Sequence, residues 1–204
     1  SPASRMAGRA WTLLSGRAAN PPGTVGDYIG DVPPGSVIVP DNGGGNGGVK
    51  AVTAIDKLSL ITVEGKGMLG VPGIAARTFG AVAKAQVSVL LISQASSEQS
   101  ICFATPDDLA DKVIGSLNAE FAEEIHRQDV DRIWGQHAVS IVTVVGAGMR
   151  GTPGIAGRVF TALGQHAVNI IAIAQGSSEC SISLVVDGQD AAAAVRYIHD
   201  LILA

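Results

Sequence analysis

The spacing of apolar residues along the chain predicts a series of strands and helices. Apolar and polar positions alternate from residue 49 onward, which predicts two strands, at 49–55 and 58–63. A continuous apolar run predicts a buried strand at 87–93. By the same patterns, further strands are expected at 100–104, 130–134, 139–145, 168–174 and 181–186.

Helical spacing of apolar residues predicts four helices between and after these strands. Pro72 suits the first turn of a helix that ends near Lys84, and an equivalent helix is expected at 154–165. Thr105 is expected to cap the start of a third helix, and a fourth helix covers 191–203. The third helix carries one apolar face, made of Leu109, Val113, Leu117, Phe121 and Ile125.

One stretch of the chain occurs twice. The sequences GKGMLGVPGIA at 65–75 and GAGMRGTPGIA at 146–156 align with an offset of 81 residues (146 − 65). The match continues to Gln94 and Gln175, each followed after one residue by Ser-Ser-Glu. Self-similarity at a fixed offset indicates a duplicated structural unit.

The order of the predicted elements indicates an α+β protein made of two ferredoxin-like units. The first unit has the order βαββαβ, whereas the second has βαββα and lacks its last strand. The strand at 49–55 is left over in front of the first unit. Because an open sheet edge is a liability, we predict that strand 49–55 completes the second sheet and that the first unit is inserted in the second.

This order predicts where the domains begin and end. The expected parts are an N-terminal segment with a Gly/Pro-rich linker at 1–48, a strand of the second unit at 49–56, the first unit at 57–136 and the second unit at 137–204. Residues 1–19 are interpreted either as a short helix or as the irregular start of a cut chain, and 36–39 as a brief strand.

Composition removes several classes of function. Of the 204 residues, 47% are hydrophobic, the net charge is −4, and no basic stripe with interleaved aromatic residues suggests nucleic-acid binding. No apolar run reaches the ~20 residues of a membrane span or the ~7–15 residues of a signal peptide at the N-terminus, so a cytoplasmic protein is expected. Cys102, Cys180 and the four histidines show no metal-ligand spacing, so we expect no metal site.

Both glycine-rich loops match G-x-G-x-x-G, and each lies between a strand and a helix, as in a dinucleotide site. Two features argue against a nucleotide. Gln94 and Gln175 stand where the fingerprint expects an acid at the end of the next strand. The connection of about six residues after that strand also requires an antiparallel pair, because a parallel crossover needs a dozen residues or more.

Two interpretations of the loops remain open. N–H groups at a helix start attract a carboxylate, and Ser88 with Gln94, or Asn169 with Gln175, would complete a site for a small zwitterion. Alternatively, the glycines only permit tight turns and close packing of helix on strand. No nucleophile, carboxylate pair or phosphate-binding motif indicates catalysis, and we interpret the serines at 96–97 as a polar hairpin tip.

Four segments together carry a family resemblance. The strings GKGMLGVPGIAARTF, VSVLLISQASSEQSI, GAGMRGTPGIAGRVF and VNIIAIAQGSSECSIS resemble the paired ACT domains of aspartate kinases, above all the subgroup with fused aspartate kinase–homoserine dehydrogenases. The resemblance covers about residues 20–203. In this family an end-product amino acid binds between paired ACT units, so the resemblance implies a feedback sensor. It also agrees with an inserted first unit.

Carried over position by position, the resemblance implies two effector sites. The first would consist of Gly70, Val71, Pro72, Gly73, Ile74, Ala75, Ser88 and Gln94. The second would consist of Gly151, Pro153, Gly154, Ile155, Ala156, Asn169, Ile170 and Gln175. Ser88 stands where many ACT units have asparagine, so the first site is expected to be weaker or differently selective.

The resemblance also implies an effector and partners. The two glutamines favour threonine by family analogy, and lysine is the alternative, although the loops offer its ammonium few acids beyond Glu64 and Glu98. The family kinases phosphorylate aspartate, and ATP and magnesium would belong to a kinase domain that this chain does not contain. We expect a homodimer formed through ACT sheets, as a regulatory fragment or a free-standing chain. A module that only assembles and binds nothing is the rival hypothesis.

Overall fold

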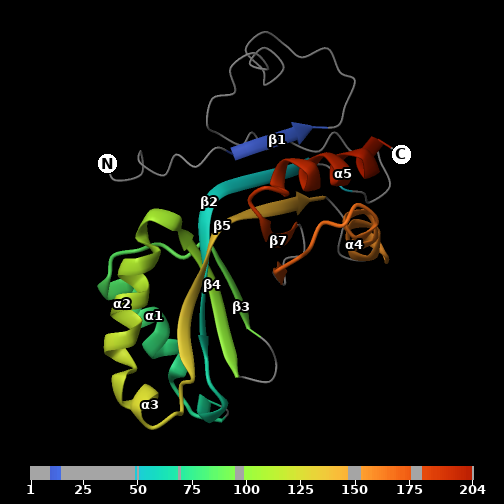
Figure 1. Cartoon of the computed structure of the whole chain (residues 1–204). Helices are drawn as coiled ribbons and strands as arrows, with labels where there is room; N and C mark the ends of the chain where they lie inside the picture. The colour runs from blue at the N-terminus through green and yellow to red at the C-terminus, as the bar shows by residue number, and fades with distance from the viewer. Residues whose placement is uncertain are drawn as a thin grey trace. The chain divides into compact units, whose positions relative to one another are not determined.

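A computed structural model of the chain defines residues 10–14, 49, 51–68, 70–94, 99–146, 153–175 and 181–203 (Figure 1). In chain order the elements are β1 (Ala10–Leu14), β2 (Ala51–Glu64), η3 (Lys66–Met68), α1 (Ile74–Lys84), β3 (Leu91–Gln94), β4 (Ser100–Pro106), η4 (Asp107–Leu109), α2 (Ala110–Glu120), α3 (Ala122–His126), β5 (Arg132–Val145), α4 (Ile155–Gln165), β6 (Ala172–Gln175), β7 (Ser181–Asp187) and α5 (Ala191–Leu203). The strand expected at 36–39 and the hairpin tip at 96–97 lie outside the defined residues.

The chain folds as two compact units. Residues 57–139 form one, here called the inserted unit, and residues 1–56 with 140–204 form the other, here called the outer unit. Strands follow the order β3-β4-β2-β5 in the inserted unit and β1-β2-β5-β7-β6 in the outer unit. The first half of β2 thus supplies the strand that the second repeat lacks, which confirms the predicted ferredoxin-like fold with one unit inserted in the other.

Each unit has its own apolar core. In the inserted unit, α1, α2 and α3 all lie on one side of the strands (Figure 1), and the rings of Phe79 and Phe103 meet edge to face at 5.6 Å. The predicted apolar face of the third helix packs into this core, with Val113, Leu117 and Phe121 fully buried. The outer unit buries residues of α4 and α5 against β2, β5 and β7.

The duplication extends to the backbone. Positive φ angles occur at Lys57 and Ala138 (61° and 54°), at Gly73 and Gly154 (89° and 90°), and at Gln86 and Ala167 (57° and 56°). Each pair has the offset of 81 residues found between the repeated sequences. The two repeats therefore place their irregular residues at the same points of the fold, and not only their strands and helices.

Two predicted breaks between strands are wrong. Residues 49–55 and 58–63 were expected as separate strands, and so were 130–134 and 139–145, but β2 and β5 each run without interruption. Lys57 and Ala138 take up the irregularity within the strands by adopting left-handed φ angles. A non-glycine residue in this region is uncommon in a strand, and sequence patterns give no sign of it.

Other local predictions also differ from the structure. The buried strand expected at 87–93 is the short strand β3, and Leu90 and Ile92 beside and within it are 39% and 48% exposed. Thr105 is a fully buried residue of β4, where it pairs with Ser59, and caps no helix. The long third helix breaks after Glu120, whose carbonyl accepts a hydrogen bond from Arg77 Nη2 at 2.7 Å. Residues 10–14 form a strand, not a helix.

Two buried threonines lead to a prediction about stability. Thr78 and Thr105 are fully buried in the inserted unit, and neither hydroxyl has a hydrogen-bond partner among the defined residues. The outer unit has Val159 and Val186 at the equivalent positions. Burying a hydroxyl without a partner costs about 1–3 kcal/mol, so replacing either threonine by valine is expected to raise the free energy of unfolding by about 1 kcal/mol.

Urea unfolding of Thr78→Val and Thr105→Val measures this gain. The reverse changes, Val159→Thr and Val186→Thr, are the matched controls in the outer unit and should lower the unfolding midpoint. If both valine variants unfold at lower urea than the parent chain, the two hydroxyls have partners in solution and the prediction is wrong.

Candidate functional site

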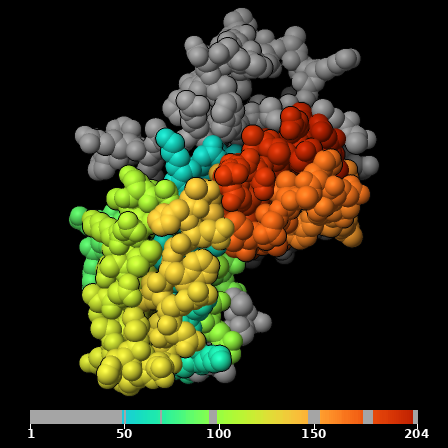
Figure 2. All heavy atoms as spheres, viewed as in Figure 1, coloured from blue at the N-terminus to red at the C-terminus, as the bar shows by residue number. Residues whose placement is uncertain are grey.

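The first two glycines of the loop in the inserted unit are required by packing. A Cβ added to Gly65 would lie 2.2 Å from the carbonyl oxygen of Asp129, and one added to Gly67 would lie 2.5 Å from Asp129 Cα. The Gly67 N–H donates to the Asp129 carbonyl at 3.1 Å. The loop therefore presses against the segment that leads into β5, and Figure 2 shows its turquoise atoms beside the gold atoms of that segment.

The last glycine of the loop shapes the start of α1. Gly73 has a φ of 89° and is the N-terminal capping residue, but it offers no side chain to cap the helix. The first intrahelical bond runs from the Arg77 N–H to the Gly73 carbonyl (2.9 Å). The N–H groups of Ile74, Ala75 and Ala76 therefore have no acceptor within the helix and point out of its start. Such a start is an anion-binding environment.

The remaining loop residues of the first predicted site surround this helix start. Val71 is 48% exposed, and Pro72, Gly73 and Ala75 are also exposed. The Ile74 side chain is buried in the core and anchors the first turn. Gly70 also has a left-handed φ, of 70°, which a side chain would oppose. The segment thus presents backbone to solvent while one side chain fixes it.

Gln94 lies at the same end and on the same face of the sheet as the start of α1. In the antiparallel register Gln94 lies beside Ile101, and Ile101 lies beside Val63, two residues before the loop begins. Ile101 and Val63 belong to the core cluster that also contains Ile74. At ~4.8 Å per strand, Gln94 and Val63 are about 10 Å apart. The structure therefore brings the exposed Gln94 side chain toward the helix start.

Ser88 is not brought to this place within its own unit. It is exposed and lies six residues before Gln94, beyond the C-terminal end of α1. Six extended residues span about 20 Å. Ser88 therefore follows the end of α1 opposite its start, and six residues of chain separate it from Gln94.

The second predicted site has the same arrangement in the outer unit. Gly154 caps α4 with a φ of 90°, Pro153 is exposed, Ala156 is half-buried, and Ile155 is buried in the core. Gln175 is exposed at the end of β6, where it pairs with Ile182 of β7.

The strand residues of the second site also match those of the first. Asn169 is exposed, six residues before Gln175, as Ser88 is before Gln94. Ile170 is half-buried against the core. Gly151 lies outside the defined residues.

An ion network, which the sequence analysis did not find, lies beside the first site. Arg77 donates from Nη1 and Nη2 to the two carboxylate oxygens of Glu124, at 2.5 and 3.2 Å, and from Nε to Glu120 at 3.1 Å. Its guanidinium also lies 4.7 Å from the centre of the Phe121 ring. These bonds raise the pKa of Arg77 above its ordinary value and lower the pKa of Glu124, in both cases chiefly through the Arg77–Glu124 bond.

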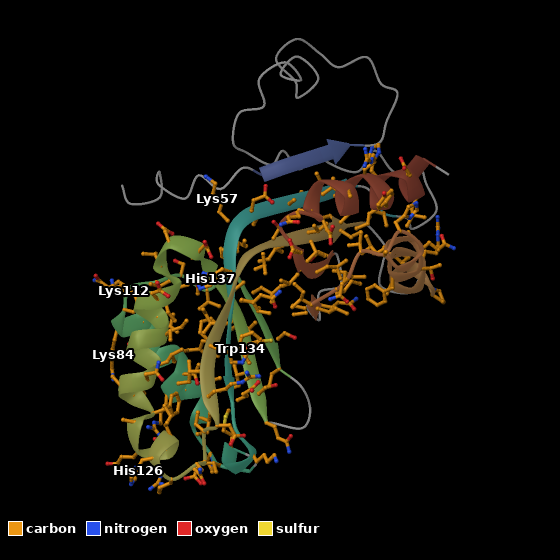
Figure 3. The ribbon with its side chains drawn as sticks, in the orientation of Figure 1. Lys57, Lys84, Lys112, His126, Trp134 and His137 are labelled. Atoms are coloured by element: carbon orange, nitrogen blue, oxygen red, sulfur yellow. The ribbon has the colours of Figure 1, made fainter. Side chains whose placement is uncertain are left out.

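A second polar cluster was also not predicted. Ser59 Oγ, which is fully buried, donates to Asp107 Oδ1, and His137 Nδ1 lies 3.0 Å from Ser59 Oγ and 2.9 Å from Asp107 Oδ1. His137 lies at the end of the inserted unit opposite His126 (Figure 3). Although the three residue types match a hydrolase triad, one imidazole nitrogen contacts both partners. A triad requires a different nitrogen for each, so this cluster is structural.

The Asp107 carboxylate makes stability depend on pH. The hydrogen bond from Ser59, and secondarily that from His137, lowers the pKa of Asp107. A carboxylate whose pKa is lower in the folded state contributes stability above its unfolded pKa, about 4, and this is lost as pH falls through the folded pKa. Asp107→Asn is therefore expected to lower the free energy of unfolding at pH 7 by about 1 kcal/mol, because screening at a partly exposed side chain limits the effect.

The measurement is urea unfolding of Asp107→Asn and the parent chain at pH 7 and near pH 3. The difference should be present at pH 7 and should shrink as pH falls below about 4 and through the lowered folded pKa of Asp107. Asp108→Asn, a change at the exposed neighbouring position, should leave the midpoint unchanged at both pH values. An equal loss at both pH values for Asp107→Asn would mean that the carboxylate charge is unimportant.

The described residues also bear on metal binding, thiol chemistry and membrane crossing. Among the defined parts of the chain, no three His, Cys, Asp or Glu side chains gather as metal ligands. The Cys102 thiol is half-buried, donates to the Ser93 carbonyl at 3.2 Å, and has its pKa raised by burial. Of the defined helices, none combines the length and apolar character needed to cross a bilayer. β3 pairs antiparallel with β4, and β6 with β7, as the argument against a dinucleotide fold required.

Comparison with known proteins places this geometry in a family. A family model described as an ACT domain matches residues 61–121 and again residues 142–201. The chain belongs to the ACT domain family. Each match begins in the strand before a glycine-rich loop and includes the following helices, so the two ACT domains of the chain are the two repeats found in its sequence.

Relatives of these ACT domains occur in aspartokinases. A chloroplastic bifunctional aspartokinase/homoserine dehydrogenase of Zea mays is 38% identical over 192 residues, 92% of this chain and 21% of the relative. The bifunctional enzyme of Haemophilus influenzae is 45% identical over 151 residues, 74% of this chain and 18% of the relative. The chain thus spans about a fifth of the length of these curated relatives.

A solved structure gives a similar result. The regulatory subunit of aspartate kinase from Thermus flavus superimposes with a TM-score of 0.66 at 27% sequence identity, and the match covers 76% of this chain and 99% of that subunit. The paired ACT domains described here are therefore similar to a complete regulatory subunit of an aspartate kinase.

Proposed function

We propose that this chain is the amino-acid-sensing regulatory region of an aspartokinase and that its effector is threonine. The observation that carries the proposal is the position of Gln94. Its amide lies at the end of β3 on the core-facing side of the sheet, toward the uncapped start of α1. Gln175 and the start of α4 repeat this arrangement in the second ACT domain.

The two ends of such a site suit the two ends of an amino acid. The carboxylate would accept hydrogen bonds from the N–H groups at the start of α1 or α4. The ammonium or the side-chain hydroxyl of threonine would meet the amide oxygen of Gln94 or Gln175. The glutamine amides carry no charge, so the sites suit a polar, uncharged side chain better than the second ammonium of lysine.

A second copy of the chain would complete the first site. Leu90, beside the edge strand β3 of the inserted unit, and Ile92, within it, are 39% and 48% exposed, and Ile173 is 41% exposed on the edge strand of the outer unit. Exposed apolar strand edges favour pairing with another strand. If two copies pair antiparallel through β3, Ser88 of one approaches Gln94 of the other, which places it near the helix start that it does not reach in its own unit.

The regulated activity would lie outside this chain. We propose that the kinase domain, with its ATP and magnesium, is either part of the same polypeptide or a separate subunit in the cytoplasm, and that it phosphorylates aspartate. Threonine would then shift the enzyme between states through its differential affinity for them. A module that only assembles the enzyme is the second candidate, favoured by the exposed apolar strand edges alone.

A thermal-shift screen tests the proposal. The chain is melted with threonine, lysine, methionine, isoleucine and S-adenosylmethionine in turn. A ligand at ~100 times its Kd stabilises the folded state by about 2.7 kcal/mol, which raises the melting temperature by several degrees. A shift with threonine alone is expected. A shift with lysine instead would retain the sensor and replace the effector, and no shift with any ligand would refute the sensor.

A further inference from the structure

The glycine loop and the start of α1 are held at their two ends by one residue, Glu124 of α3. At one end, the Glu124 carboxylate binds the guanidinium of Arg77, the first residue of α1 whose N–H is bonded within the helix. At the other end, the Glu124 carbonyl accepts from the N–H groups of Asp129 and Val130, at 2.9 and 3.2 Å. The side chain of Glu124 thus holds the first turn of α1, and its backbone holds the segment at 129–130 that contacts the loop.

The segment 129–131 passes this restraint on to the loop. The Asp129 carbonyl accepts from the Gly67 N–H at 3.1 Å, and the Asp131 carboxylate accepts from the Lys66 N–H at 3.3 Å. The Asp131 N–H in turn donates to the Glu64 carbonyl at 2.8 Å, which fixes the residue before the loop. The closeness of Gly65 to Asp129 leaves no room for the loop to move toward β5. The loop therefore has a fixed start, and α1 has a fixed first turn.

The second ACT domain repeats one of the Arg77 bonds. Arg158, at the position equivalent to Arg77, donates to the Leu201 carbonyl at 3.2 Å, just as Arg77 donates to the Glu120 carbonyl at 2.7 Å. In the first domain Arg77 adds a two-pronged bond to Glu124, whose side chain is only 14% exposed. Ionic bonds of this kind are stronger than neutral ones and fix the orientation of both groups.

We propose that Glu124 is a positioning residue for the first effector site. It sets the distance between the glycine loop and the N–H groups at the start of α1, so that these groups are pre-organised for the effector carboxylate. The inference rests on the proposed effector site. It adds that the affinity of the first site, but not of the second, depends on an ion pair in the neighbouring helix. The amide of Gln94 would be unaffected, because it is held by the sheet.

Double variants separate the two sites. In a Gln175→Ala background only the first site binds threonine, and adding Glu124→Gln is expected to weaken it about 3- to 10-fold in isothermal titration calorimetry. In a Gln94→Ala background only the second site binds, and adding Glu124→Gln should leave its Kd unchanged. Amide hydrogen exchange at residues 66–76 should become faster with Glu124→Gln. A role in packing alone would lower stability but would not separate the two sites.

Lys84→Met is the matched control. It removes the neighbouring ion pair between Lys84 of α1 and Glu120 of α2, at 3.0 Å, and Lys84 lies on the outer side of these helices (Figure 3). The Gln175→Ala variant should bind threonine with the same Kd whether or not it also carries Lys84→Met. An unchanged Kd for Glu124→Gln in this background, or an equal weakening in both backgrounds, would overturn the inference. If the parent chain itself does not bind threonine, the proposed function is refuted. Failure of the proposed function can therefore be told apart from failure of the inference about Glu124.

Discussion

Replacing Gly65 by alanine is expected to lower the free energy of unfolding of the inserted unit by about 3 kcal/mol or more. The added Cβ would lie 2.2 Å from the Asp129 carbonyl oxygen, 2.6 Å from Val130 Cα and 2.9 Å from Asp131 N. All three atoms are backbone, so no side-chain rotation relieves the overlap. The segment 129–131 would have to move away from the glycine loop, and the 2.8 Å hydrogen bond from the Asp131 N–H to the Glu64 carbonyl would be lost.

Urea unfolding, with the fluorescence of Trp134 in β5 as the signal, measures this loss of stability. Gly115→Ala is the control, because an added Cβ at Gly115 meets nothing within 4 Å. Gly115 lies within α2, so alanine there should raise the free energy of unfolding by up to about 1 kcal/mol. The two changes add the same methyl group and should act in opposite directions. A Gly65→Ala variant as stable as the parent chain would mean that the loop and the 129–131 segment are not packed together.

Gln175→Ala and Asn169→Ala are expected to remove threonine binding at the second site without unfolding the chain. Both side chains are exposed, so truncating them should change the free energy of unfolding by no more than about 0.5 kcal/mol. A hydrogen bond to a charged group contributes about 1.5–3 kcal/mol, and loss of one weakens binding by about 10-fold or more. The effect on binding should therefore far exceed the effect on stability.

Calorimetric titration with threonine and melting without ligand check the two halves of this expectation. Gln165→Ala provides the control, since Gln165 is an exposed glutamine at the other end of α4. It should bind threonine like the parent chain. Threonine affinity retained in both Gln175→Ala and Asn169→Ala would show that the site residues are wrongly assigned. The result for Asn169 also bears on the dimer, because Asn169 precedes Gln175 by six residues, as Ser88 precedes Gln94.

Much of the fold could be predicted because its signals are local. The helices at 74–84, 155–165 and 191–203 follow from apolar spacing. The placement of Pro72 in the first turn is wrong, because Gly73 is the capping residue and Pro72 precedes it, as Pro153 precedes Gly154. The insertion followed from counting strands, because the repeat made the missing strand visible. The left-handed angles at Lys57 and Ala138 gave no such signal, since lysine and alanine do not mark positive φ as glycine does.

The candidate site was predicted only in part. The resemblance selected the backbone of the two helix starts and the two glutamines, and the strand register brings Gln94 toward the first helix start. Glu124 and Asp129 were not selected, although they restrain the loop. No pattern within the loop indicates them, because Arg77 and Glu124 are 47 residues apart and Gly67 and Asp129 are 62 apart (129 − 67).

The sequence by itself determined the duplication, the order of strands and helices in each repeat, and the membership of strand 49–55 in the second sheet. These follow from short-range periodicity and turn chemistry, repeated at one offset. Only the tertiary structure decided which glycines are forced by close packing and which open the start of a helix. It alone joined Ser59 to His137 across 78 residues and Arg77 to Glu124. Contacts of this kind depend on how strands and helices pack against one another. The spacing of residues along the sequence does not predict that packing.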